Sequence, residues 1–190
     1  MTACLRLCLC AWLALAAPSQ SAAADYGFRV LRAELKPDAT GKAWGLLDAD
    51  IDYRFSEATL DALRNGVSLT LVLRLAVKRE RQGWWDATAL DENRPFRVRY
   101  HALSKLYQIL DGDGETPRNF VSINALLEAM GSVRRMPWAL ASPLSPGARY
   151  RASLAVGLDI ESLPLPLRPV AYLTPAWYLD SPVYQWTFAN

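Results

Sequence analysis

Hydrophobic and polar residues alternate with a period of two along much of the chain, which is typical of strands with one buried face. Residues 28–35 are apolar enough for a strand, although their alternation is imperfect. In the final stretch Tyr184, Trp186 and Phe188 share one face, and we expect them in the core. The clearest strand patterns span residues 45–55, 67–77, 96–101 with a continuation at 105–110, 148–160 and 183–188.

Two short stretches carry helix signals instead. Ser56 and Ser122 are suitable N-cap residues, because a serine side chain accepts a hydrogen bond from the free backbone N–H groups of the first turn. Gly66 and Gly131 stand where each helix is expected to end. The proline-rich residues 163–175 lack alternation. We expect an extended crossover there, since proline cannot donate a ladder hydrogen bond.

The order of these elements indicates a mainly β fold. Many strands separated by turn signals, without long helices between them, favour an antiparallel architecture over a parallel α/β sheet. No repeat, low-complexity tract or linker divides the chain. We therefore predict a single antiparallel β-sandwich with two short helices, formed by residues 25–190.

The first 24 residues have the features of a cleaved signal peptide. Arg6 precedes an apolar run of 11 residues, 7–17, and Ala22, Ala23 and Ala24 offer the small side chains that a signal peptidase accepts. This run is shorter than the ~20 residues that span a bilayer as a helix, which argues against an uncleaved signal anchor. We expect cleavage after Ala24, a mature protein in the periplasm and no stable membrane span after cleavage.

Composition restricts the chemistry of the mature protein. All three cysteines lie in the leader, so residues 25–190 contain no disulfide, thiol nucleophile or thiolate metal site. The whole chain has 21 basic and 19 acidic residues and a formal net charge of +2, which disfavours nucleic-acid binding. His101 is the single histidine, so a metal site built from two or three imidazoles is excluded. We predict no metal and no cofactor.

Three aspartates share the polar face of the strand predicted at 45–55. Asp48, Asp50 and Asp52 could form a cation site or a docking surface for a basic partner. We favour a structural role, because opposite charges that face one another across strands stabilise a sheet. The expected partners are the arginines of neighbouring strands, Arg97 with Arg99 or Arg149 with Arg151.

Two further motifs fall short of a recognisable chemistry. Residues 111–115 resemble the start of a calcium loop, but Thr116 stands where such a loop requires glycine and Ser122 where it requires glutamate. A glycine-rich turn is favoured there. His101 could serve a Ser-His-Asp triad, yet the chain has no G-x-S-x-G elbow, and its alternating strand position favours a solvated or hydrogen-bonded side chain. We predict no catalytic residues.

The adjacent residues Trp84 and Trp85 form the most informative aromatic pair. Neighbouring residues of a strand face opposite ways, so one of the two rings is expected to meet solvent or a partner. Arg79 and Arg81 lie close by in the sequence, and arginine and tryptophan are enriched among interface hot spots. These four residues are our candidate partner-binding site. The alternative is a structural role, with a tryptophan packed over a sheet edge.

Five segments carry a family resemblance: 62–67, 79–86 with its paired tryptophans, 99–104 followed by Tyr107, 163–168 and 177–186. Together they resemble the bacterial domain of unknown function family 4390, over nearly all of residues 28–188. The resemblance implies an exported bacterial protein whose gene often lies beside those of a sensor histidine kinase and its response regulator. It implies no catalytic residues.

The sequence therefore leads to two functional hypotheses. The first is a non-enzymatic periplasmic interaction protein, an accessory to an envelope-sensing two-component system. It would contact the periplasmic part of a sensor histidine kinase through the four candidate residues. The alternative is a glycan- or lipid-binding β-sandwich that uses the same tryptophans as a stacking platform. A hydrolase that depends on His101 is a distant third.

Overall fold

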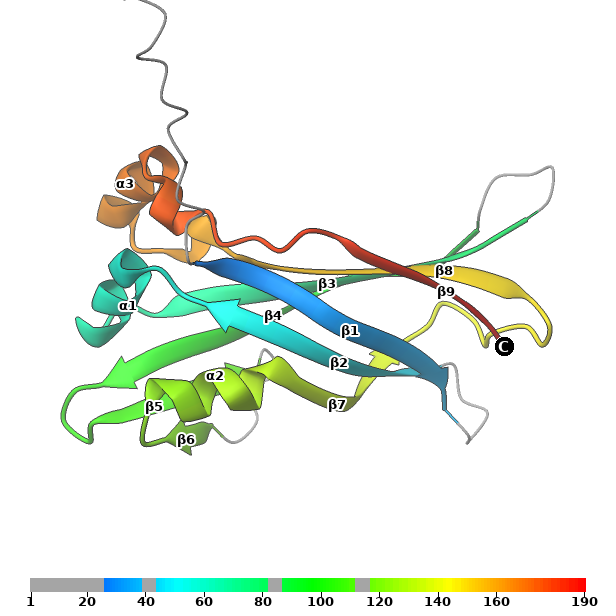
Figure 1. The fold of residues 1–190 in the computed structure, drawn as a ribbon, viewed down its shortest axis with the longest axis horizontal. Helices are drawn as coiled ribbons and strands as arrows, with labels where there is room; N and C mark the ends of the chain where they lie inside the picture. Colours follow the sequence, from blue (N-terminus) through cyan, green and yellow to red (C-terminus); the bar gives the residue numbers. More distant parts are fainter. Residues whose placement is uncertain (1–25, 39–43, 82–86, 112–116) are drawn as a thin grey trace, which may run out of the picture.

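Two antiparallel β-sheets make up most of the molecule (Figure 1). The computed structural model describes residues 26–38, 44–81, 87–111 and 117–190. Among these residues the smaller sheet has three strands and the larger has six, and one hydrophobic core joins them. The predicted mainly β, sandwich-like fold is confirmed.

The strand order explains which side chains can meet. The small sheet runs β1–β2–β7, and the large sheet runs β6–β5–β4–β3–β8–β9. All neighbouring strands of the described residues pair antiparallel. The strands are β1 (Gly27–Pro37), β2 (Trp44–Arg54), β3 (Leu69–Arg79), β4 (Ala87–His101), β5 (Leu106–Asp111), β6 (Arg118–Phe120), β7 (Ser132–Ala139), β8 (Arg149–Leu158) and β9 (Tyr184–Ala189).

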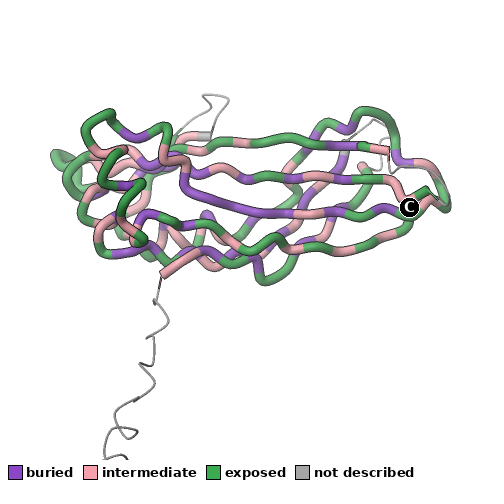
Figure 2. The backbone as a smooth tube through the Cα atoms, turned by 90° about the horizontal axis from the view of Figure 1, so that it is seen from above, coloured by how far each residue is buried: buried purple, intermediate pink, exposed green. Residues whose placement is uncertain are grey.

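The core follows from the alternation seen in the sequence. Along β2, β3 and β8 every second residue points between the sheets, and Figure 2 shows buried and exposed positions alternating along the long strands. Burial of each large apolar side chain stabilises the fold by about 1.5–3 kcal/mol. The fully buried side chains on these strands include Leu47, Leu69, Leu71, Leu73, Leu75 and Leu154.

Both predicted helices form, with the predicted serine caps. In α1 (Glu57–Arg64) the Ser56 hydroxyl accepts a hydrogen bond from the backbone N–H of Thr59 at 3.3 Å. In α2 (Ile123–Gly131) the Ser122 hydroxyl accepts from the N–H of Ala125 at 3.2 Å. Gly66 follows α1 with a φ of +85°, which glycine adopts without strain. Among the helices of the described ranges, none has the length and hydropathy that a membrane span requires.

The prediction of an extended crossover at 163–175 is wrong. The chain instead forms the 3-10 turn Leu165–Leu167, a third helix α3 (Arg168–Leu173) and the 3-10 turn Pro175–Trp177. Prolines stand in the first positions of all three elements, where a backbone N–H has no partner within the helix and its absence costs nothing. In Figure 1 this segment lies with α1 at one end of the sandwich.

Two strand regions lack a clear alternating pattern, and the sequence did not predict them. On β7, the register with β2 shifts between Leu47 and Ala49, so that Arg134 and Arg135 both face Asp48 in a β-bulge. On β4, the strand begins at Ala87, although polar residues fill its middle. The aromatic stripe of β9 packs against the core but stays half-buried, because β9 is an edge strand.

Candidate functional site

The first two candidate partner-binding residues lie where β3 ends. Arg79 is half-buried, and its guanidinium donates a hydrogen bond to the Ser145 hydroxyl at 3.2 Å. Arg81 is exposed and has no hydrogen bond or ion pair with any residue of the described ranges. Trp84 and Trp85 lie outside the described residues. The structure therefore places the arginine half of the predicted site.

Strand β8 brings further cations to this end of the molecule. Lys78 of β3 pairs in register with Arg151 of β8, and Arg149 lies two residues before Arg151. The Arg151 guanidinium forms an ion pair with Glu80 at 2.7 Å, whereas Lys78 and Arg149 have no ion pair within the described ranges. We call this surface the basic end; it consists of Lys78, Arg79, Arg81, Arg149 and Arg151.

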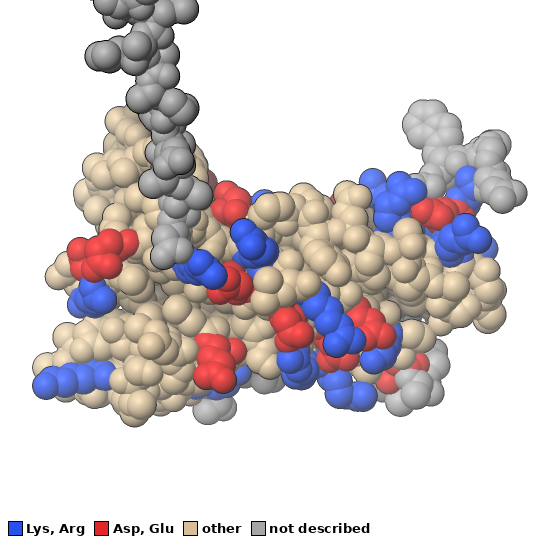
Figure 3. Space-filling model, in the orientation of Figure 1, with Lys and Arg blue, Asp and Glu red and all other residues tan. Residues whose placement is uncertain are grey.

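Figure 3 shows basic side chains gathered around an acidic one at this end of the molecule. Over the small sheet, by contrast, basic and acidic side chains are interspersed in the same view. The sequence did not indicate Lys78 as a site residue, and we expected Arg149 and Arg151 to pair with the aspartates of β2. The alternating patterns of 67–77 and 148–160 put these cations on or directly after predicted strands. Only the pairing of β3 with β8 brings them together.

The acidic residues of β2 are neutralised within their own sheet, but not by the expected partners. Asp48 accepts a hydrogen bond from the backbone N–H of Arg135 at 2.7 Å, and Asp50 pairs with Arg134 at 2.5 Å. Asp52 pairs with Arg54 at 3.0 Å. The predicted structural role fits these contacts. The predicted partners on β4 and β8 are wrong, because the neighbours of β2 are β1 and β7.

His101 belongs to a hydrogen-bonded polar cluster on the large sheet. Its Nε2 lies 3.1 Å from the Oε1 of Gln108, which also accepts a hydrogen bond from Arg99 at 2.7 Å. The side-chain amide of Gln108 in turn donates to Asn119 at 2.9 Å. Within the described part of the chain, no serine hydroxyl contacts His101 and no group of three or more histidine, cysteine, aspartate or glutamate residues could hold a metal ion. The glycine-rich turn predicted at 111–115 lies outside the described residues except for Asp111, which ends β5.

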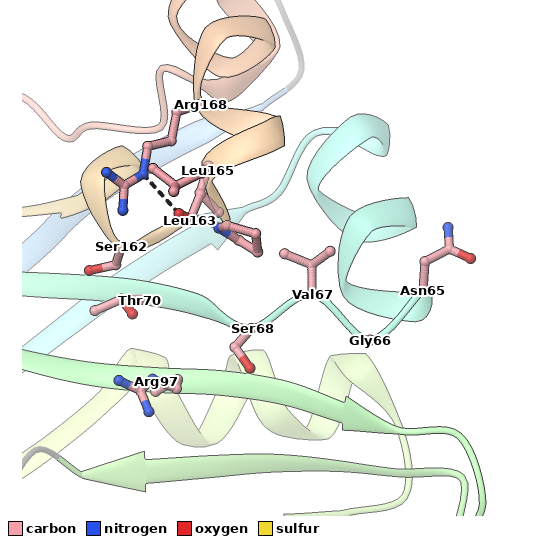
Figure 4. A pocket seen from close by; sticks show the side chains of 11 residues that line it. Asn65, Gly66, Val67, Ser68, Thr70, Arg97, Ser162, Leu163, Leu165 and Arg168 are labelled. Carbon is pink, nitrogen blue, oxygen red and sulfur yellow. Dashed lines mark hydrogen bonds between the residues drawn. The ribbon is translucent and has the colours of Figure 1, made fainter.

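A pocket of about 580 Å³ opens beside the start of β3, below the segment that leads to α3 (Figure 4). Arg168 and Arg97 lie on opposite sides of it, with the Thr70 side chain between them. The Nε of Arg168 donates to the Leu163 carbonyl at 2.9 Å, and its Nη1 lies 3.5 Å from Glu161. Two side chains of the pocket make no hydrogen bond or ion pair within the described ranges: the exposed guanidinium of Arg97 and the hydroxyl of Thr70, a residue that is 7% exposed. The pocket can hold a small polar group.

A second cavity, of about 490 Å³, lies between the two sheets where β7 faces β4 and β5. We call it the inter-sheet cleft. Arg118, Arg134, Arg135 and Tyr53 also line it, and burial raises the pKa of Tyr53 above its ordinary value. Its apolar walls come from both sheets and from α2: Leu73, Phe96, Ile109, Met130, Val133 and Met136.

The described part of the chain thus forms a β-sandwich with α1 and α3 at one end, and its cavities include the two described above. The family described as Domain of unknown function (DUF4390) matches residues 27–187, and the chain belongs to this family. The resemblance noted in the sequence is thereby confirmed. No curated protein and no solved structure is a significant match to the chain.

Proposed function

We propose that this protein is an exported, non-enzymatic interaction protein whose basic end contacts an acidic surface of a partner protein. The observation that carries the proposal is the register of β3 and β8, which sets Lys78 directly opposite Arg151. Like charges in opposed positions destabilise a sheet. Glu80 offsets one of the two charges, and the remaining cations form no ion pair within the described ranges.

An acidic partner would supply the missing counter-charges. Carboxylates of the partner would relieve the repulsion at Lys78, and they would accept hydrogen bonds from the exposed guanidinium groups of Arg81 and Arg149. Arginine suits this role because its planar guanidinium binds a carboxylate through two hydrogen bonds. Complementary charge also accelerates encounter, so we expect association to be faster at low ionic strength.

The partner that we propose is the periplasmic part of a sensor histidine kinase. Export is supported by the leader, with its apolar run at 7–17 and the small residues before Asp25. The choice of partner is supported by the family resemblance, which associates these genes with a sensor kinase. A non-enzymatic role agrees with the hydrogen-bonded setting of His101.

The test is affinity capture with in-cell crosslinking, comparing the wild type with a double charge reversal, Arg81→Glu with Arg149→Glu. Both side chains are exposed and make no hydrogen bond or ion pair in the described structure, so the fold should be retained. The wild type should recover the kinase segment, and the double variant should recover at least tenfold less of it.

The matched control is Arg29→Glu with Lys105→Glu. These two cations are also exposed and form no hydrogen bond or ion pair with the described residues. Arg29 belongs to the start of β1 and Lys105 to the β4–β5 turn, and both of these segments lie at the end of the sandwich away from the turn that follows β3 (Figure 1). The net charge changes equally in both variants. Equal recovery of the kinase segment by the two double variants would refute docking through the basic end. Recovery of no protein by the folded wild type would refute the interaction itself and favour a glycan or lipid ligand.

A further inference from the structure

The inter-sheet cleft is deeper than a surface depression. Leu73 and Ile109 are 1% and 2% exposed, yet both line the cavity, so it reaches the buried core. Its walls also include Met130 and Met136, whose unbranched, polarisable side chains adapt to different apolar shapes. A volume of about 490 Å³ lies within the range of roughly 300–1,000 Å³ found for small-molecule sites.

The charged residues of the cleft have a single sign. Three arginines and no acidic residue are found among the described residues that line it. Arg134 is engaged by Asp50 and by the carbonyl oxygens of Ala49 and Val133. Arg135 is different, because its guanidinium has no hydrogen bond or ion pair with the described residues. Since Arg135 is exposed and also lines the cavity, its side chain lies at the mouth.

The backbone holds Arg135 in an uncommon conformation at this mouth. Its φ is +48°, in the left-handed region that residues with a Cβ rarely adopt. The bulge opposite Asp48 creates this conformation, and the Asp48 carboxylate stabilises it by accepting the backbone N–H of Arg135. A β-bulge redirects side chains relative to a regular strand. Tyr53 also lines the cleft; this residue is 5% exposed, and its side chain makes no hydrogen bond within the described ranges.

We infer that the inter-sheet cleft binds a free, single-chain anionic amphiphile of the fatty-acid type. The acyl chain lies against the apolar walls, and the carboxylate pairs with Arg135 at the mouth. The apolar lining selects the chain, and Arg135, whose guanidinium makes no hydrogen bond or ion pair with the described residues, selects the charge of the head group. This ligand site is separate in its lining residues from the basic end, so it adds a second binding activity to the proposed function.

The inference is tested by titration calorimetry of the mature chain with dodecanoate below its micelle concentration. One molecule should bind per chain, and decanoate should bind more weakly by roughly fourfold for each methylene removed. Dodecyltrimethylammonium has the same chain with a cationic head, and it should bind at least tenfold more weakly than dodecanoate. Equal affinity for the anionic and cationic amphiphiles would overturn the inference.

Two substitutions locate the ligand. Arg135→Gln should weaken dodecanoate binding at least tenfold, whereas Arg32→Gln, an exposed arginine of β1 outside the cleft, should leave it unchanged. Ala129→Phe adds a ring to the α2 wall and should abolish binding by filling the cleft. Circular dichroism and thermal unfolding verify that each variant is folded. Undiminished binding by folded Ala129→Phe would contradict the site.

A membrane is the competing source of anionic amphiphiles. Vesicles of phosphatidylglycerol should not co-sediment with Arg81→Glu with Arg149→Glu, a variant that lacks two exposed cations of the basic end, because a two-chain lipid held in a bilayer cannot place its chain in the cleft. Co-sedimentation of this variant that is lost when Ala129→Phe is added would place a bilayer lipid in the cleft and would overturn the inference of a free amphiphile.

Discussion

Lys78 on β3 and Arg151 on β8 lie directly opposite one another in the large sheet. The arrangement is unfavourable for the isolated fold, since like charges at opposed positions repel. On the small sheet, the opposed acidic residues Glu34 and Asp48 both lie near Lys36, at 3.4 and 3.9 Å from its Nζ, and Asp50 and Asp52 each have a basic partner within 3.0 Å. The basic end therefore carries positive charge that the fold does not use, which favours a role in binding.

Lys78→Glu should separate stability from binding. The new carboxylate would face Arg151, so we expect the free energy of unfolding to rise by roughly 0.2–1 kcal/mol, measured by chemical denaturation. Capture of the acidic partner should weaken in the same variant. Lys105→Glu, in the β4–β5 turn, provides the control for the change in net charge. A lower stability for Lys78→Glu would show that the opposed cations do not repel in this sheet.

Asp48→Ala should destabilise the fold more than Asp52→Ala. Asp48 accepts the backbone N–H of Arg135 and thereby supports the β7 bulge, whereas Asp52 contacts the exposed side chain of Arg54. A hydrogen bond to a charged group contributes about 1.5–3 kcal/mol, and an exposed ion pair about 0–1 kcal/mol. Denaturant unfolding measures both. Equal losses in the two variants would mean that Asp48 does not support the bulge.

Gly131→Ala should be strongly destabilising although glycine is a poor helix former. A Cβ at this position would collide with the carbonyl oxygen of Ile51 on β2, and a backbone atom cannot move aside without shifting the strand. We expect a loss of about 1–3 kcal/mol in the free energy of unfolding. Glu128→Ala, at an exposed position of the same helix, should stay within about 0.5 kcal/mol of the wild type. A neutral Gly131→Ala would show that α2 does not lie this close to β2.

Tyr53 should make the fold sensitive to alkaline pH. Burial raises its pKa above the ordinary 10.0, so the folded state keeps the proton after the unfolded chain has lost it. The stabilisation is fully present below about pH 10 and is lost as pH rises further, by roughly 1.4 kcal/mol per pH unit. Tyr53→Phe should lose this contribution to the fall between about pH 9 and about pH 11, while Asp52→Ala should keep it. Identical pH dependence in Tyr53→Phe and the wild type would contradict the assignment.

Much of the fold could be predicted because its strands and caps are local signals. The alternating pattern of 45–55 becomes β2, and Ser56 and Ser122 cap the two helices as expected. The elements that the sequence did not predict depend on contacts with residues that are distant in the chain or on their exact position in a helix. β7 loses its alternation at a bulge that is held by Asp48 of another strand. In the helical segment after Leu163, prolines stand in the first turn of the elements. A proline in the sequence does not by itself show whether a helix begins there or an extended segment continues.

The candidate site could be predicted only in part, because it depends on strand order. Arg79 and Arg81 belong to one stretch of chain and were identified together. Their grouping with Arg149 and Arg151 requires the pairing of β3 with β8, which no local pattern reveals. The inter-sheet cleft is still less visible, since its walls come from both sheets and from α2.

The most direct test of the basic end is the affinity of purified residues 25–190 for the periplasmic segment of a sensor histidine kinase, the partner that we propose, measured at low and at high ionic strength. We expect the wild type to bind more weakly as salt rises, because salt screens exposed charges. Arg81→Glu with Arg149→Glu should bind poorly at low salt, where Arg29→Glu with Lys105→Glu still binds tightly. An affinity that is independent of salt, and equal in the two double variants, would contradict docking through the basic end.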